Sequence, residues 1–352
     1  MMLLRTLWHE HMPILLLILL HLLSGYALQA WLDQPIMNMA LSYEVVNLFV
    51  VLFAVCFLSG HALWSLPKVP DGESAFKFIY HDLKTVWLTP QRLLGYAIVH
   101  LCLPFFMSTF QCIKIAIPAV VPFSWDVAFH DWDVALHGGR MPWEWLQFLG
   151  GDGPTLWLNV AYNLWFFVLF GLVVWQGFSM NRALRFRFLF SFLVIFIIGG
   201  NLLAMALASV GPCFWGLELG QPDPYGPLME RLHATNGRFL EANGVDGVHL
   251  WSMDVQQQLW AVYDTSTFET VGGISAMPSM HVASATLFAC LGWAHSKPLG
   301  VLLTAFAVII QIGSVHLGWH YAVDGYIGAS LTLAVWFGVG WVMKKTGYLA
   351  PV

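Results

Sequence analysis

Two short stretches of the chain combine residue types that could act on a phosphate group. The first, over residues 272–281, is rich in glycine and ends in the sequence Pro-Ser-Met-His, where an apolar helical segment begins. A helix N-terminus offers free N–H groups and a positive dipole end, which together favour an anion. Ser279 adds a hydroxyl and His281 can give up a proton. We therefore expect Gly273, Pro278 and Ser279 to bind substrate.

The second stretch, over residues 314–324, pairs a histidine with a carboxylate. His320 and Asp324 are four residues apart, a spacing that places both on one helix face. The aspartate can hold one imidazole nitrogen and leave the other basic, as in a nucleophile with its orienting group. His316 and Tyr321 flank this pair, and we expect both to contact substrate.

Two other interpretations of these residues were weighed. Histidines within membrane helices are often satisfied structural groups, and this is our reading of His21, His61, His100 and His130. His281, His320 and Asp324 differ because they occur together with Pro-Ser and with flanking glycines. His316 and His320 have the spacing of a zinc pair, but no glutamate lies between them and spacing dictates no third ligand. We therefore expect no metal and no cofactor.

The composition places these motifs in a membrane. Of 352 residues, 58% are hydrophobic and only 10% are charged, against about 25% in a soluble domain. The mean hydropathy is +0.68. The net charge of −5 comes with no basic patch of the kind that binds nucleic acid. The chain is therefore predicted to be an integral membrane protein with no nucleic-acid partner, and its sequence does not set an oligomeric state.

The hydrophobic pattern predicts an all-α, polytopic membrane helix bundle. A membrane helix needs about 20 mostly apolar residues, and eight windows of the sequence qualify. They cover residues 12–32, 43–65, 92–113, 155–179, 187–210, 277–294, 299–315 and 322–343. The apolar N-terminal stretch is interpreted as an uncleaved first helix rather than a signal peptide, because Leu28 is too large for a cleavage site.

The positive residues predict an orientation. With the N-terminus inside, the cytoplasmic segments hold 11 of the 15 Lys and Arg residues. These are Arg5, Lys68, Lys77, Lys84, Arg92, Arg182, Arg185, Arg187, Lys297, Lys344 and Lys345. The other side holds Lys114, Arg140, Arg231 and Arg238. The positive-inside rule then places both termini in the cytoplasm and both chemical motifs at the outer boundary.

Two long segments lie on the outer side in this arrangement. Residues 114–154 carry several tryptophans among acids and glycines, which indicates a re-entrant or surface-lying piece. Residues 211–275 form a larger insert with helical character near 226–242 and 249–263. A lid over a site and a plain cap between helices are both compatible with this insert.

The two motifs resemble those of the type-2 phosphatidic acid phosphatase superfamily. That superfamily carries a basic motif ending in Arg-Pro, then Pro-Ser-Gly-His, then Ser-Arg followed by His and Asp. The second motif is similar to Pro278-Ser279-Met280-His281, with Met in the Gly place, and the third to His320 and Asp324. The form His-Tyr-x-x-Asp is most similar to the inositolphosphotransferase branch, which includes inositol phosphorylceramide synthase.

The resemblance implies a six-helix catalytic core over 92–343, with the extracytoplasmic insert 211–275. Residues 1–91 would add two helices and a cytoplasmic loop. It also implies that His320 attacks phosphorus to form a phosphohistidine, that Asp324 orients it, and that His281 protonates the leaving oxygen. The substrate would be a phospholipid or a prenyl phosphate at the outer membrane face.

The basic residues of the superfamily motifs are missing. Gly313 and Ser314 stand in place of Ser-Arg, and the chain has no Arg-Pro pair. His316 could partly replace the lost arginine, and Arg140, Arg231 or Arg238 could fold over the site.

These losses favour a phosphotransferase over a plain phosphatase. A simple lipid or isoprenyl phosphate phosphatase and a non-catalytic transporter or scaffold remain as alternatives. The compact chain is interpreted as a bacterial inner-membrane protein.

Overall fold

The protein is a bundle of long helices. The computed structural model describes residues 2–34, 39–265 and 272–349, and all regular structure within these ranges is helical. Seven helical segments are long and apolar enough to cross a membrane. They are α1 (Met2–Leu32), α2 (Met39–Ser65), α4 (Pro90–Val120), α7 (Asp152–Phe178), α8 (Arg182–Ile197) with its extension, α14 (Lys297–His316) and α15 (Ala322–Thr346). The predicted polytopic membrane bundle is thus confirmed.

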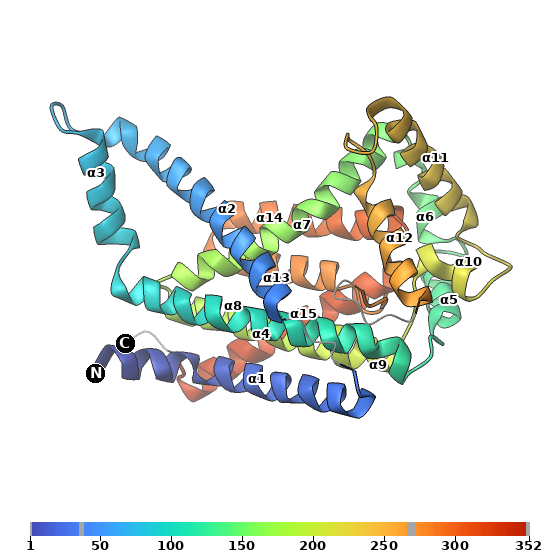
Figure 1. Cartoon of the computed structure of the whole chain (residues 1–352), viewed down its shortest axis with the longest axis horizontal. Helices are drawn as coiled ribbons and strands as arrows, with labels where there is room; N and C mark the ends of the chain where they lie inside the picture. Colours follow the sequence, from blue (N-terminus) through green and yellow to red (C-terminus); the bar gives the residue numbers. More distant parts are fainter. Residues whose placement is uncertain (1, 35–38, 266–271, 350–352) are drawn as a thin grey trace.

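The remaining predicted window, over 277–294, is the short helix α13 (Met280–His295). Its 16 residues span about 24 Å, which is less than a full bilayer core. It begins at Met280 because residues 272–276 form no regular helix and the Ser279 side chain caps the first turn. α13 packs against α7, α8, α14 and α15 in the middle of the bundle (Figure 1). A short helix suffices there because neighbouring helices, rather than lipid, surround it.

The two ends of the bundle carry different elements. The two termini and α3 (Ala75–Asp82) lie at one end (Figure 1). The other end carries α5 (Asp126–Leu136), α6 (Pro142–Trp145), α10 (Trp215–Glu218), α11 (Gly226–Asn243) and α12 (Trp251–Asp264). The two insert helices, α11 and α12, match the helical stretches predicted near 226–242 and 249–263. The start of α1 and the end of α15 therefore lie at the opposite end of the bundle from α11 and α12.

The first two long helices pack directly on α4, α7 and α8. α1 packs on α4 and α8, and α2 packs on α4 and α7. The buried carboxylate of Glu10 on α1 accepts a 2.7 Å hydrogen bond from Arg185 of α8 and pairs with Arg182 at 2.5 Å. A buried ion pair is costly to break, because removing one partner leaves an uncompensated charge. This pair fixes α1 to α8.

One helix boundary differs from the prediction in a way that matters for the site. The predicted window over 92–113 stops one residue before Lys114. In the structure α4 continues to Val120, so Lys114 lies within the helix, close to its C-terminal end. A lysine at this depth is tolerated where its long side chain reaches a polar region.

Candidate functional site

His320 and Asp324 contact each other, although not across a helix face. His320 lies in the loop before α15, and its Nδ1 is 3.2 Å from Oδ2 of Asp324. Asp324 is the third residue of α15, and the same oxygen accepts a 3.1 Å hydrogen bond from the Tyr321 backbone N–H. When Asp324 is ionised, its carboxylate can only accept, so this contact then requires the proton on Nδ1 and leaves Nε2 its lone pair.

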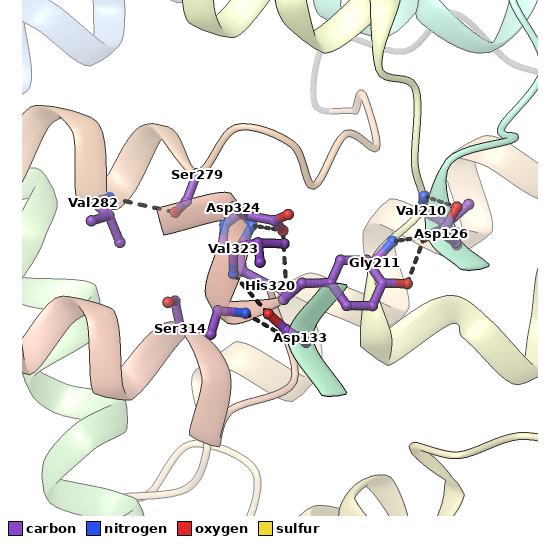
Figure 2. A network of polar contacts seen from close by, with 12 residues as sticks. Asp126, Asp133, Val210, Gly211, Ser279, Val282, Ser314, His320, Val323 and Asp324 are labelled. Atoms are coloured by element: carbon purple, nitrogen blue, oxygen red, sulfur yellow. Dashed lines mark hydrogen bonds and ion pairs between the residues drawn. The ribbon is translucent and has the colours of Figure 1, made fainter. Parts of the chain in front are cut away.

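The segment containing Ser279 and His281 meets this loop through the backbone. The Ser279 N–H donates a 3.0 Å hydrogen bond to the carbonyl oxygen of Asp324. The Ser279 hydroxyl accepts from the Val282 N–H at 3.4 Å and so caps α13 (Figure 2). The two motifs, about 40 residues apart in sequence, are therefore joined by one hydrogen bond at the N-termini of α13 and α15.

Aromatic rings of α7 hold the His281 imidazole. Its centroid lies 4.4 Å from that of Tyr162 and 4.2 Å from that of Trp165. Trp165 is itself fixed by a 2.8 Å hydrogen bond from its indole N–H to the Ser284 hydroxyl on α13. The His281 and His320 centroids are 6.3 Å apart. Stacking against two rings restricts the imidazole of His281 to one orientation beside His320.

Both histidines line one cavity of about 260 Å³. Gly273 and Pro278, two of the residues predicted to bind substrate, also line it. Helix α12 of the insert covers it with Ser252, Val255 and Leu259.

Three of the residues predicted to bind substrate do not line the cavity. Ser279 caps α13 and is fully buried. His316 is fully buried as well, and its Nε2 lies 2.9 Å from the Thr155 hydroxyl. The Tyr321 hydroxyl points to α5, where it donates to Asp126 at 2.8 Å. In this structure these three side chains hold the surrounding helices in place.

Two buried aspartates of α5 complete this support, and the sequence did not predict them. Asp133 accepts hydrogen bonds from the first two backbone amides of α15, Ala322 at 2.7 Å and Val323 at 2.9 Å. Asp126 accepts from Gly211 at 2.9 Å and from the residue before it. Figure 2 shows both carboxylates between α5 and the loop carrying His320. A carboxylate at a helix N-terminus satisfies free N–H groups and complements the dipole.

Burial shapes the protonation of these groups. It lowers the pKa of His320 to about 3; the nearby Lys114 ammonium acts in the same direction and a backbone hydrogen bond at Ala276 opposes it. Burial raises the pKa of Asp133 to about 6, although its backbone hydrogen bonds act in the opposite direction. The free imidazole of His320 is thus neutral at physiological pH, as a nucleophile requires.

The three arginines that the sequence offered as cations for the site lie away from it. Arg238 pairs with Asp152 at 2.6 Å, Arg140 lies over the Trp145 ring, and Arg231 lies beside Gly150. None of these three arginines lines the cavity, whereas Lys114 does. Among the described residues, no group of three or more His, Cys, Asp or Glu side chains is arranged to hold a metal ion.

A second cavity, of about 340 Å³, adjoins the first. It is lined mainly by apolar side chains of α2, α4, α7 and α8, and both cavities share Phe110, Trp165, Phe166 and Phe196. Val45 of α2 and Phe166 of α7 are 38% and 45% exposed at this cavity. The apolar space next to the histidines therefore extends to the outer surface of membrane-spanning helices.

Comparison with known protein families places this helical fold. The family model described as the PAP2 superfamily matches residues 128–338, more than half of the chain, and the chain belongs to this superfamily. Searches of curated proteins and of solved structures returned no significant match. Superfamily membership and the membrane helices together indicate a lipid phosphatase-type enzyme.

Proposed function

We propose that this protein is a lipid phosphotransferase, similar to the inositolphosphotransferase branch, that works through a phosphohistidine on His320. The observation that carries the proposal is the shared cavity of His320 and His281, with Asp324 behind the nucleophile. Two imidazoles facing one space can act in turn on one phosphoryl group. The neutral ring of His320 supplies the nucleophile, and Asp324 stabilises the positive charge that develops on it.

The reaction has two steps in this proposal. The Nε2 lone pair of His320 forms a bond to phosphorus, and the bond from phosphorus to the leaving oxygen breaks. The proton of the His281 imidazolium passes to that oxygen, and the anionic substrate favours this charged form of His281. An acceptor O–H then attacks phosphorus, its proton passes to His281, and the P–N bond breaks.

The insert favours an alcohol over water as the acceptor. α12 covers the cavity with Ser252, Val255 and Leu259, and the Gln256 amide donates to the Leu317 carbonyl of the catalytic loop at 3.0 Å. A covered site limits the access of bulk water and so protects a phosphorylated intermediate from hydrolysis. This makes a lid the better of the two interpretations of residues 211–275.

The proposal includes a place in the membrane. The catalytic core comprises 92–343, and 1–91 adds two helices to it. The Lys and Arg distribution favours cytoplasmic termini and an active site on the periplasmic side of a bacterial inner membrane. The donor is a phospholipid or a prenyl phosphate, whose hydrocarbon chain fits the apolar second cavity.

The test is turnover of a panel of detergent-solubilised phospholipids and prenyl phosphates, with and without inositol and other alcohols. The intact protein is compared with His320→Ala and with His233→Ala, which replaces an exposed histidine of α11 as a matched control. We expect a new phospholipid only with an alcohol, full activity in the control and none in His320→Ala. Mass spectrometry of the acid-quenched intact protein at low temperature should show a phosphorylated peptide containing His320.

Other outcomes separate the alternatives. Release of free phosphate without any alcohol product would identify a simple phosphatase. Equal turnover by His320→Ala would remove the phosphohistidine mechanism. Absence of turnover in a correctly folded protein across the panel would favour the transporter or scaffold.

A further inference from the structure

The candidate site has an unassigned cation. The superfamily arginine before the catalytic histidine is absent here, where Gly313 and Ser314 stand, and the three outer arginines lie away from the cavity. Lys114 of α4 belongs to neither of the two motif-bearing stretches, 272–281 and 314–324. Its side chain nevertheless lines the same cavity as His281 and His320.

The charge of Lys114 has no balancing partner among the described residues. The structure gives no carboxylate within ion-pairing distance of its ammonium group in residues 2–34, 39–265 and 272–349. Among the described residues that line the cavity, Lys114 is the only Lys, Arg, Asp or Glu. An unpaired cation in an apolar membrane protein is costly, and it is typical of a position that binds an anion.

The glycine-rich segment fixes the position of Lys114. The Gln111 side chain, one turn earlier on α4, donates a 2.6 Å hydrogen bond to the Gly272 carbonyl. A Cβ added at Gly273 would lie 3.0 Å from both Cγ and the backbone carbonyl carbon of Lys114. Gly273 has a φ of +93°, so only glycine fits this close approach without strain. The backbone that leads to His281 thus packs directly on the lysine.

We propose that Lys114 binds the phosphoryl oxygens of the substrate and takes the place of the missing arginine. Lys114 lines the cavity with both imidazoles. An anion there would receive two donors, the ammonium and the His281 imidazolium, while the Nε2 lone pair of His320 faces phosphorus. A lysine binds phosphate as a point charge, whereas an arginine does so through a planar fork. The ligand is therefore an anionic phosphoryl group. This inference rests on the proposed function for its role in turnover, but binding can be tested apart from chemistry.

The test measures binding of inorganic phosphate to the full-length protein in detergent, in a His320→Ala background where no phosphoryl transfer can occur. Lys114→Met is compared with Lys114→Arg and with Lys84→Met, which replaces an exposed lysine at the other end of the bundle. We expect Lys114→Met to weaken phosphate binding about 10- to 100-fold, as loss of a charged hydrogen bond would. Lys114→Arg should retain most of the affinity, and Lys84→Met should match the background.

The outcomes distinguish this inference from the proposed function. Equal phosphate binding by Lys114→Met, with an unchanged melting temperature, would overturn the role of Lys114 even if the parent protein transfers phosphate. The role of Lys114 would also be overturned if the His320→Ala protein with Lys114 intact bound no phosphate. Loss of binding in Lys114→Met, with no lipid turnover by the parent, would support the anion site and remove the transferase.

Discussion

The Tyr321 hydroxyl donates a 2.8 Å hydrogen bond to the Asp126 carboxylate, which joins two buried residues 195 positions apart in the sequence. Tyr321 directly follows His320, and Asp126 begins α5. The same carboxylate accepts from the backbone of Gly211 at the start of the insert. One buried side chain therefore links the loop that carries His320 to the start of the segment that covers the cavity.

Loss of this hydrogen bond should lower the free energy of unfolding less than loss of the whole Asp126 carboxylate does. Tyr321→Phe leaves Asp126 two backbone donors, so we expect the free energy of unfolding to fall by about 1 kcal/mol. Asp126→Ala leaves a hydroxyl and two N–H groups unsatisfied. We expect it to lower the free energy of unfolding by about 3 kcal/mol. Unfolding in detergent measures both values. Tyr326→Phe, which removes a partly exposed hydroxyl bonded to His137, is the control and should have little effect. If Tyr321→Phe and Asp126→Ala lowered the free energy of unfolding equally, the two backbone hydrogen bonds to Asp126 would not contribute to stability.

Asp133 should affect turnover more than substrate binding. It caps α15 immediately after His320, so Asp133→Ala should shift the nucleophile without removing any group that touches substrate. We expect kcat to fall about 10-fold with KM nearly unchanged, because small misplacements of a catalytic group are costly. Asp133→Asn keeps one acceptor oxygen and should be intermediate. Asp131→Ala, on the exposed side of α5, should behave like the parent protein. A rise in KM alone would argue against a positioning role.

The pH profile should lack the acid limb of an ordinary histidine nucleophile. With its pKa lowered to about 3, His320 loses its proton at low pH and is neutral from about pH 4 upward. Asp324 contacts it, and Lys114, Tyr162, Cys213 and His281 are the other titratable groups that line its cavity among the described residues. We expect kcat/KM for a phosphodiester lipid to change less than about 3-fold between pH 7 and 5.

A nucleophile with a pKa of about 6.5 would instead lose about 30-fold at pH 5. Such a loss, reversible on return to pH 7, would show that the imidazole is not held neutral. Lys114→Met removes a cation beside His320, so the acid limb should move to higher pH in that variant. The direction of this movement is independent of any effect on KM.

Gly273→Ala should impair substrate binding. The added Cβ would press on Lys114 at 3.0 Å and would sit on a backbone with φ of +93°. We expect KM to rise at least about 10-fold as the lysine is displaced, with a loss of stability of about 1–2 kcal/mol. Gly138→Ala separates the two causes, since Gly138 has a φ of +70° but open space around its Cβ position. Gly138→Ala should therefore lower the stability of the protein and leave KM unchanged. Unchanged KM in Gly273→Ala would contradict the close packing on Lys114.

The helices and the two histidine motifs could be predicted because both depend on local sequence. Apolar windows of membrane length indicate helices regardless of their neighbours. Pro-Ser-Met-His and His-Tyr-x-x-Asp are contiguous patterns, so their chemistry is legible before the fold is known. The short helix α13 was less clear, since its window included residues 277–279, which precede the cap at Ser279.

The supporting residues could not be predicted because their contacts span long sequence distances. Asp126 and Asp133 lie in a tryptophan-rich segment that resembled a surface piece. Only their spacing of seven, which places them on one face of a helix, could have indicated a shared role. Lys114 was placed on the outer side but was not among the cations expected at the site, and its place in the cavity depends on α4 continuing to Val120.

The adjoining apolar cavity has a kinetic consequence. It reaches the exposed sides of Val45 and Phe166 on membrane-spanning helices, and it meets the catalytic cavity at Trp165. A lipid that enters by this route exchanges one hydrocarbon environment for another, so its tail never crosses water. The rate then depends on the mole fraction of substrate in the membrane, and diluting the bilayer with inert lipid slows the enzyme while adding buffer does not.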